Sequence, residues 1–296
     1  MKKVIVVLGP TAVGKTKIGI ELAKRLNTEI ISGDSVQVYK GLDIGSAKAT
    51  VEEMDGIKHH LIDILEPNMD YSVCDFQKHA RELIEKLDVP VIVGGTGLYI
   101  KAAISNYEFD APKRDYSFEE EYANYSNEEL YEILKEKDPK MCEIIHQNNR
   151  KRVLRALFAV MNNEPLSEKN GKDELVYDPY IIYLNTDREI LYERINKRVD
   201  IMIEMGLEKE VTDLYNQGIM PHALGYQEFI PYFNKEVSIN DVVEEIKKNS
   251  RHLAKRQITW FKHQMDTHFY KVNLLNINET IEEIYQDVIK FLGVWF

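Results

Sequence analysis

Apolar residues follow two different patterns along this chain of 296 residues. Short continuous apolar runs predict buried strands, and they lie at residues 4–8, 29–31, 91–93 and 180–184. Apolar residues at helical spacing predict helices, and these lie at residues 17–26, 75–87, 242–263 and 281–292, with a further long helix after a capping-box pattern at 186–189. Strands that alternate with helices are typical of an α/β fold with a parallel sheet.

The middle of the chain has a different texture. Residues 108–178 show no strand pattern, whereas Ser126 and Glu129 form a capping-box pattern and residues 152–161 repeat apolar side chains at helical spacing. We therefore predict a helical insertion at residues 108–178, with a polar loop or hinge over 162–178. The α/β core is expected from residues 1–107 and 179–296.

Composition bounds the class of protein without specifying its function. Hydrophobic residues make up 44% and charged residues 29% of the chain, which is ordinary for a globular protein with a sizeable core. No apolar run approaches the length that crosses a bilayer, and the N-terminus does not resemble a signal peptide. Cys74 and Cys142 provide neither a disulfide framework nor metal-ligand spacing. We expect a cytoplasmic protein without a membrane partner.

Residues 9–16 carry the clearest chemical signal. They read Gly-Pro-Thr-Ala-Val-Gly-Lys-Thr between the first predicted strand and the first predicted helix, which is the setting of a phosphate-binding loop. Backbone N–H groups and the helix N-terminus would surround a phosphate, Lys15 would neutralise its oxygens, and the Thr16 hydroxyl would ligate Mg²⁺. The alternative is a structural glycine turn with a surface lysine. Taken alone, the loop favours phosphates such as those of ATP.

Three further side chains are candidates because of where the predicted elements end. Asp34 follows the second strand and Thr96 lies in a glycine-rich turn after the third, so both are expected at the sheet edge where α/β folds bind ligands. Asp34 is either a turn or N-cap carboxylate or a general base or Mg²⁺ partner. The glycine-rich turn either binds a ligand or only connects strand to helix. Arg198, on the long helix, either faces solvent or returns over the phosphate site.

The charge distribution is uneven. The net charge of −11 argues against generic nucleic-acid binding. Residues 247–264 nevertheless hold several Lys and Arg and no acid, and residues 150–155 hold a second basic cluster. Each cluster alone is most simply a solvated helix face. Together, they favour a specific polyanionic partner.

Six blocks of sequence, in order, resemble one family. Residues 34–48 read Asp-Ser-Val-Gln-Val-Tyr-Lys-Gly-Leu-Asp-Ile-Gly-Ser-Ala-Lys, which closely resembles the signature of the tRNA dimethylallyltransferases, the isopentenyl transferases that modify adenosine in tRNA. The other blocks that resemble this family are residues 9–16, residues 93–99, the series Arg198, Met202, Gly206 and Glu210, residues 224–228 and residues 254–260. The resemblance spans nearly the whole chain and implies a P-loop NTPase-like core.

The resemblance implies a reaction and roles for individual residues. The family transfers a dimethylallyl group from dimethylallyl diphosphate to the exocyclic amine of the adenosine on the 3′ side of the anticodon. The loop then binds the diphosphate leaving group with Mg²⁺ rather than ATP. Asp34 matches the general base, Lys15 and Arg198 would stabilise the diphosphate, and Thr96 matches a residue of the reaction channel. The implied diphosphate-binding residues are Gly9, Pro10, Thr11, Ala12, Val13, Gly14, Lys15 and Thr16, with Thr16 as the metal ligand.

The resemblance also implies contacts with tRNA, whose target adenosine must be extruded into a channel. The implied tRNA-binding residues are Asp34, Ser35, Val36, Gln37, Thr96, Lys151, Arg152, Val153, Leu154, Arg155, His222, Gly225, Tyr226, Gln227, Arg251, Lys255 and Arg256. The helical insertion would grip the anticodon loop, and nothing in the sequence suggests more than a monomer. The chain departs mildly from the family at residues 147–149, Phe158, Lys40 and Ser46.

Two other functions share some of these features. A small-molecule or nucleotide kinase has a phosphate loop, an aspartate after the second strand and lid arginines, but it does not account for the loop over residues 37–48 or for the basic residues. A nucleotide-regulated switch would bind ATP or GTP without prenyl chemistry. Transfer of labelled dimethylallyl to tRNA separates the three.

Overall fold

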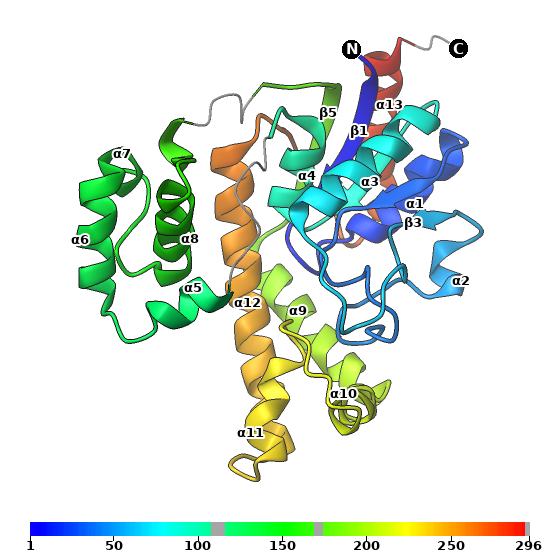
Figure 1. The fold of residues 1–296 in the computed structure, drawn as a ribbon. Helices are drawn as coiled ribbons and strands as arrows, with labels where there is room; N and C mark the ends of the chain where they lie inside the picture. Colours follow the sequence, from blue (N-terminus) through cyan, green and yellow to red (C-terminus); the bar gives the residue numbers. More distant parts are fainter. Residues whose placement is uncertain (108–115, 169–173, 294–296) are drawn as a thin grey trace. The chain divides into compact units, whose positions relative to one another are not determined.

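The computed structural model describes residues 1–107, 116–168 and 174–293 (Figure 1). The chain forms two compact units: unit 1 comprises Met1–Ser105 and Leu175–Phe296, and unit 2 comprises Asn106–Glu174. Residues 175–178, which the sequence pattern assigned to the insertion, belong to unit 1. The reason is that Leu175 pairs with Ser105 and that Asp178 begins a strand of the sheet.

Unit 1 is built on a six-stranded sheet in the order β3-β2-β4-β1-β5-β6, with every neighbouring pair parallel. The strands are β1 (Lys3–Leu8), β2 (Ile30–Ser32), β3 (His59–His60), β4 (Val91–Gly94), β5 (Asp178–Asn185) and β6 (His268–Lys271). The predicted α/β class with a parallel sheet is confirmed. The patterns missed β3, which is only two residues long, and β6, whose four residues contain no apolar run longer than two.

Alternate residues of the central strands pack into two separate cores. Val4 and Val6 belong to one core with residues of the helices α3 (Val73–Lys86), α4 (Gly97–Ile104) and α12 (Ile239–Gln264). Ile5 and Val7 belong to the other with residues of α1 (Lys15–Arg25), α9 (Arg188–Glu204) and α13 (Ile277–Leu292). This alternation follows from the period of two in a strand, and both faces are apolar because helices cover both. Figure 1 shows the helices around the strands of this unit.

The helices of unit 1 are α1 (Lys15–Arg25), α2 (Val51–Met54), α3 (Val73–Lys86), α4 (Gly97–Ile104), α9 (Arg188–Glu204), α10 (Leu207–Asn216), α11 (Ile230–Phe233), α12 (Ile239–Gln264) and α13 (Ile277–Leu292), with a 3₁₀ turn, η2, at Gln227–Phe229. Ser238 and Asp241 form a capping box at the start of α12. The capping box expected at residues 186–189 does not form. Asp187 is the N-cap of α9 without a side-chain bond to it, and its carboxylate pairs with Lys271.

A third core in unit 1 anchors the loop that follows β2. Leu42, from this loop, is buried with Val199, Leu207 and Tyr226 of the α9–η2 region and with Val242 of α12. Val36, Tyr39 and Ile44 of the same loop also pack against this core, so several apolar side chains attach the loop to the helices around it. The loop is therefore held by packing as well as by hydrogen bonds.

Unit 2 is helical where it is described. It contains α5 (Tyr116–Glu121), α6 (Asn127–Lys137), α7 (Pro139–Cys142), α8 (Arg150–Met161) and a 3₁₀ turn, η1 (Leu166–Glu168). The predicted capping box at Ser126 and Glu129 starts α6. Leu130 and Leu134 pack against Val153 and Leu157 to form the core. Residues 169–173 of the predicted loop or hinge lie outside the described part of the chain.

Candidate active site

The phosphate-loop motif connects β1 to α1 at the carboxyl edge of the sheet. Gly14, the N-cap of α1, has φ of 105°, a conformation that a side chain would strain. A Cβ on Gly9 would lie 2.5 Å from the carbonyl oxygen of Leu184 on β5. The two motif glycines are therefore required by the turn and by a close backbone approach, as expected for a loop that surrounds a phosphate.

Lys15 lies at the start of α1, and its Nζ donates to the carbonyl oxygen of Pro10 at 2.9 Å. The pKa of Lys15 is lowered to about 8, mainly because the amine is buried and also because the positive charge of Arg198 lies nearby, while the carboxylate of Asp34 opposes this shift. Lys15, Thr16, Asp34 and Arg198 all line one pocket. The structure thus brings together four residues that are far apart in the sequence.

Asp34 lies after β2, at the end of the strand where the pattern predicted it. Its Oδ1 accepts hydrogen bonds from the backbone N–H groups of Val36 at 2.9 Å and Gln37 at 3.3 Å. This is an Asx-type turn, so the structural interpretation of Asp34 holds. A carboxylate has about four acceptor sites, and Asp34 also lines the pocket, so the same side chain can accept further hydrogen bonds from a ligand there.

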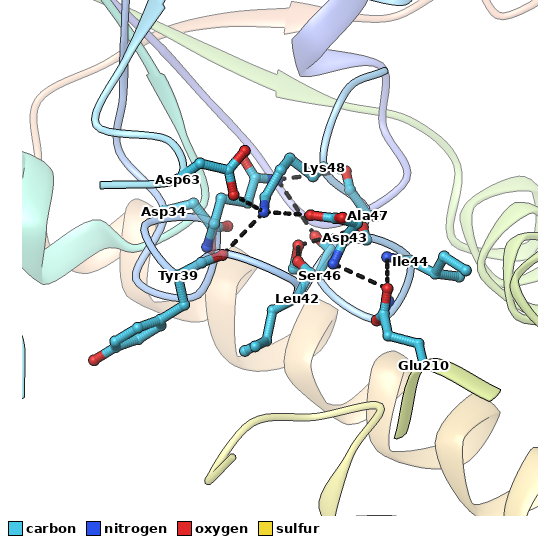
Figure 2. A network of polar contacts seen from close by, with 12 residues as sticks. Asp34, Tyr39, Leu42, Asp43, Ile44, Ser46, Ala47, Lys48, Asp63 and Glu210 are labelled. Atoms are coloured by element: carbon cyan, nitrogen blue, oxygen red, sulfur yellow. Dashed lines mark hydrogen bonds and ion pairs between the residues drawn. The ribbon is translucent and has the colours of Figure 1, made fainter. Parts of the chain in front are cut away.

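The loop after Asp34 is held from two sides (Figure 2). Lys48 is 5% exposed and forms ion pairs with Asp43 and Asp63, and it donates to the carbonyl oxygen of Tyr39 at 2.9 Å. On the other side, the Glu210 carboxylate accepts from the backbone N–H groups of Asp43, Ile44 and Gly45 at 2.8–3.1 Å. A carboxylate that receives three N–H groups holds the turn in one shape.

Arg198 lies on α9, and its guanidinium donates to the carbonyl oxygen of Ala47 at 3.3 Å. Burial lowers the pKa of Arg198, and the carboxylates of Glu53 and Asp34 oppose this shift. The side chain lines the pocket rather than extending into solvent. Of the two alternatives for this arginine, the structure supports the one in which it returns over the phosphate loop.

Thr96 has a different surrounding from the other candidates. Its Oγ1 accepts from the backbone N–H of Ser35 at 3.2 Å and lies 3.3 Å from the Ser35 hydroxyl. Its neighbour Gly95, rather than Thr96 itself, is among the residues that line the pocket. In this conformation Thr96 fixes the backbone beside Asp34.

Gln257 and His59 are among the pocket residues that were not predicted as site residues. Gln257 of α12 accepts from the N–H of Thr11 at 2.9 Å and donates to the carbonyl oxygen of Gly95 at 3.0 Å. His59 of β3 also lines the pocket, and burial lowers the pKa of its imidazole. Gln257 falls inside residues 254–260, one of the blocks that resemble the family, and this position could have identified it as a candidate site residue. His59 had none, because its strand is two residues long.

Part of the pocket wall is apolar. It includes Val199 and Met202 of α9 and Ile246 and Leu253 of α12. Polar groups that suit phosphates thus share one pocket with aliphatic side chains that suit a hydrocarbon group.

The basic cluster of unit 2 divides into exposed and buried side chains. Lys151, Arg152 and Arg155 are exposed on α8. Arg150 instead donates to the carbonyl oxygens of Tyr122, Ala123 and Tyr125 within unit 2. Val153 and Leu154, at 0% and 7% exposure, lie in the core of this unit. At helical spacing these two side chains face inward, and contact of this segment with tRNA stays a prediction.

The basic residues of α12 divide in the same way. Lys247 pairs with Asp200 and Glu244, Lys248 pairs with Glu245, and Arg251 donates to Asn196 at 2.6 Å. Lys255 and Arg256 are exposed. The sequence range 247–264 lacked acids only because the pairing carboxylates lie on a neighbouring helix and one turn earlier on α12.

The segment around Tyr226 is mostly structural. Tyr226 is fully buried, and its hydroxyl donates to Glu210 at 2.7 Å. A Cβ on Gly45 would lie 2.6 Å from the Tyr226 ring. The Tyr226 side chain therefore supports the loop after β2, and contact of its segment with tRNA stays a prediction. His222 and Gln227 are exposed, whereas Gly225 is buried with φ of 92°.

Mg²⁺ fits the donors of this pocket only as a partner of the substrate. Among the described residues, no group of three or more His, Cys, Asp or Glu is placed to hold a metal ion. Thr16 is exposed at the pocket and offers one hydroxyl oxygen. Mg²⁺ commonly keeps several waters and binds through a few protein oxygens and substrate phosphates, which this donor set allows.

In the part of the chain that is described, no helix combines the length and apolarity of a membrane span.

Fold and pocket together define a P-loop α/β protein whose site suits a phosphorylated compound with an apolar part. A profile described as IPP transferase matches residues 37–264. A tRNA dimethylallyltransferase from Macrococcus caseolyticus is 48% identical over 295 residues, which covers 95% of this chain and 94% of the relative. The chain belongs to the IPP transferase family.

Solved structures agree with this assignment. A crystal structure of a tRNA isopentenylpyrophosphate transferase from Staphylococcus epidermidis has a TM-score of 0.73 and 41% identity, and covers 98% of this chain and 99% of that one. A eukaryotic dimethylallyltransferase, described as acting on tRNA, has a TM-score of 0.84 and 28% identity. Coverage there is 98% of this chain and 78% of the eukaryotic chain. The resemblance inferred from six sequence blocks is confirmed.

Proposed function

We propose that this protein transfers a dimethylallyl group from dimethylallyl diphosphate to the exocyclic amine, N6, of the adenosine on the 3′ side of a tRNA anticodon. The observation that carries the proposal is a single pocket in which a phosphate loop, the carboxylate of Asp34 and an aliphatic wall meet. A kinase would share the first two features. The aliphatic wall, with the family assignment, favours the prenyl donor.

The diphosphate would lie on the phosphate loop, residues 9–16. Lys15 and Arg198 face the pocket and would stabilise the negative charge that develops as the carbon–oxygen bond breaks. Bound Mg²⁺ would supply further electrostatic stabilisation of the leaving diphosphate, held by the Thr16 hydroxyl together with substrate oxygens. The N–H of Thr11, by contrast, already donates to Gln257. The donors for phosphate would therefore come from the later residues of the loop.

Asp34 would act as the general base. As the N6 lone pair forms a bond to the first carbon of the dimethylallyl group, the bond from that carbon to diphosphate breaks and the nitrogen loses a proton. The Asp34 carboxylate would accept this proton, while its Oδ1 remains positioned by the N–H groups of Val36 and Gln37. Thr96 would act indirectly, by fixing the backbone at Ser35.

The adenosine reaches such a pocket only after it leaves the stack of its loop. The exposed cations Lys151, Arg152 and Arg155 of unit 2, and Lys255 and Arg256 of unit 1, would bind RNA phosphates. We further propose that the protein acts as a monomer in the cytoplasm, where its tRNA substrate resides.

One incubation tests the proposal. Purified protein, Mg²⁺, radiolabelled dimethylallyl diphosphate and unmodified tRNA should give label in the RNA, and none with tRNA that carries guanosine at the target position. The kinase alternative predicts ATP turnover and no label in the tRNA. That result would contradict the proposal.

A further inference from the structure

Gln257 stands between two hollows of unit 1. One is the pocket lined by Lys15, Asp34 and Arg198. The other is a shallow groove lined by Leu98, Arg256 and Trp260. Gln257 and its hydrogen-bond partner Gly95 line both. The Gln257–Gly95 pair is thus the wall that the pocket and the groove share.

Both polar atoms of the Gln257 carboxamide, Oε1 and Nε2, form hydrogen bonds. Its Oε1 accepts from the N–H of Thr11, inside the phosphate loop, at 2.9 Å. Its Nε2 donates to the carbonyl oxygen of Gly95, in the glycine-rich turn after β4, at 3.0 Å. Rotating the amide by half a turn would place two acceptors, or two donors, together at both ends, so its orientation is determined. The surroundings are tight, since a Cβ on Gly95 would lie 2.7 Å from Nε2.

The neighbours of Gln257 on α12 face outward. Lys255 and Arg256 are exposed, and Arg256 lines the outer groove. A polyanion bound to these cations would therefore restrain the same helical turn that holds the phosphate loop. If one ligand has already made this segment rigid, the second ligand loses less conformational entropy when it binds. Binding of the two ligands is then cooperative.

We propose that Gln257 is a positioning residue that couples occupancy of the RNA-binding face of α12 to the affinity of the phosphate loop for diphosphate. The inference rests on the proposed function, because it takes the polyanion on α12 to be tRNA. Coupling of this kind is reciprocal, so diphosphate tightens RNA binding by the same factor.

The test is a thermodynamic cycle with non-reacting ligands. Isothermal titration measures the Kd of inorganic diphosphate with Mg²⁺, with and without saturating unmodified anticodon stem-loop RNA. For the wild-type protein, RNA should tighten diphosphate binding by roughly fivefold or more, the lower end of common coupling factors. In Gln257→Met, which keeps the length but loses both hydrogen bonds, this factor should fall below about twofold.

Two further variants make the cycle decisive. Gln257→Glu keeps an acceptor for the N–H of Thr11 but loses the donor to Gly95, so its coupling factor should be intermediate, and it carries the test if Gln257→Met does not fold. Gln264→Met is the matched control, since Gln264 is exposed at the end of α12. This control should retain the wild-type factor.

Three results would overturn the inference: a wild-type protein without coupling, a Gln257→Met protein with undiminished coupling, or one that loses both single-ligand affinities alike. An assay of dimethylallyl transfer with the same wild-type preparation distinguishes failure of the coupling through Gln257 from failure of the proposed function. If transfer occurs without coupling, the inference alone fails. If no transfer occurs, the proposed function fails and the inference with it.

Discussion

The pocket and the basic face of α12 both present cations, but they hold them in different ways. Lys15 and Arg198 in the pocket have lowered pKa values because burial disfavours their charge. Lys255 and Arg256 are exposed on α12. Enclosed cations are oriented before a ligand arrives and act on one charged group at short range. Exposed cations act through many weak contacts that salt screens. We therefore expect the pocket cations to serve the chemistry and the exposed cations of α12 to serve the attachment of RNA.

The largest difference between the two regions should come from Asp34→Asn. Asparagine keeps the oxygen that accepts from the N–H groups of Val36 and Gln37, so the turn should persist. Loss of the base should lower kcat for prenyl transfer by about 10²–10⁴-fold. Single-turnover kinetics measure this, and a filter-binding assay should show unchanged tRNA affinity. A variant that lost RNA binding while keeping the chemical rate would contradict the role of Asp34.

The second-largest effect should be the pH dependence of the affinity for dimethylallyl diphosphate. Lys15 is protonated below its pKa of about 8 and loses its charge above it, so affinity for dimethylallyl diphosphate should fall as pH rises through 8. The decline attributable to Lys15 has a limit of about tenfold per pH unit. Titration between pH 7 and 9.5 measures it. Lys15→Arg is the control, because arginine stays charged throughout this range and should flatten the profile. An equally steep decline in Lys15→Arg would exclude Lys15 as its source.

The basic face of α12 should respond to salt rather than to pH. The Lys255→Ala, Arg256→Ala double variant should weaken tRNA binding and reduce the slope of log affinity against log salt by roughly 1.5. Its kcat at saturating tRNA should change little. Lys248→Ala is the matched control, since Lys248 pairs with Glu245 on the same helix. If the slope is unchanged in the double variant, these two cations do not bind RNA.

The smallest effect on RNA binding should come from the α8 cluster of unit 2. Arg152→Ala should lower the same salt slope by about one or less. Arg150→Ala should leave the slope unchanged but destabilise unit 2 by about 1–3 kcal/mol, because it removes donors to backbone carbonyls within that unit. Limited proteolysis of unit 2 reports the stability change. The opposite pattern would show that Arg150, rather than Arg152, binds RNA.

How far the sequence predicted the site is clearest from residues 247–264. The sequence correctly predicted the helix and its basic character. It did not distinguish Lys247 and Lys248, which pair with acids, from Lys255 and Arg256, which form no ion pair within the described part of the chain. Ion pairing depends on which residues of other turns and helices lie within reach, and Asp200 reaches Lys247 only because α9 packs beside α12. For similar reasons Tyr226, a candidate from the motif, is a buried support of the loop after β2.

By itself, the sequence determined the parallel α/β class, the phosphate loop, the position of Asp34 after a strand and the family. These depend on local periods and on short motifs whose physical role needs only a strand, a turn and a helix. The tertiary structure alone decided that Lys15, Asp34 and Arg198 share a pocket with an aliphatic wall, and that Glu210 and Lys48 hold the loop after β2. It also revealed Gln257 as the link between Thr11 and Gly95. Such contacts join residues far apart in sequence, so no local pattern specifies them.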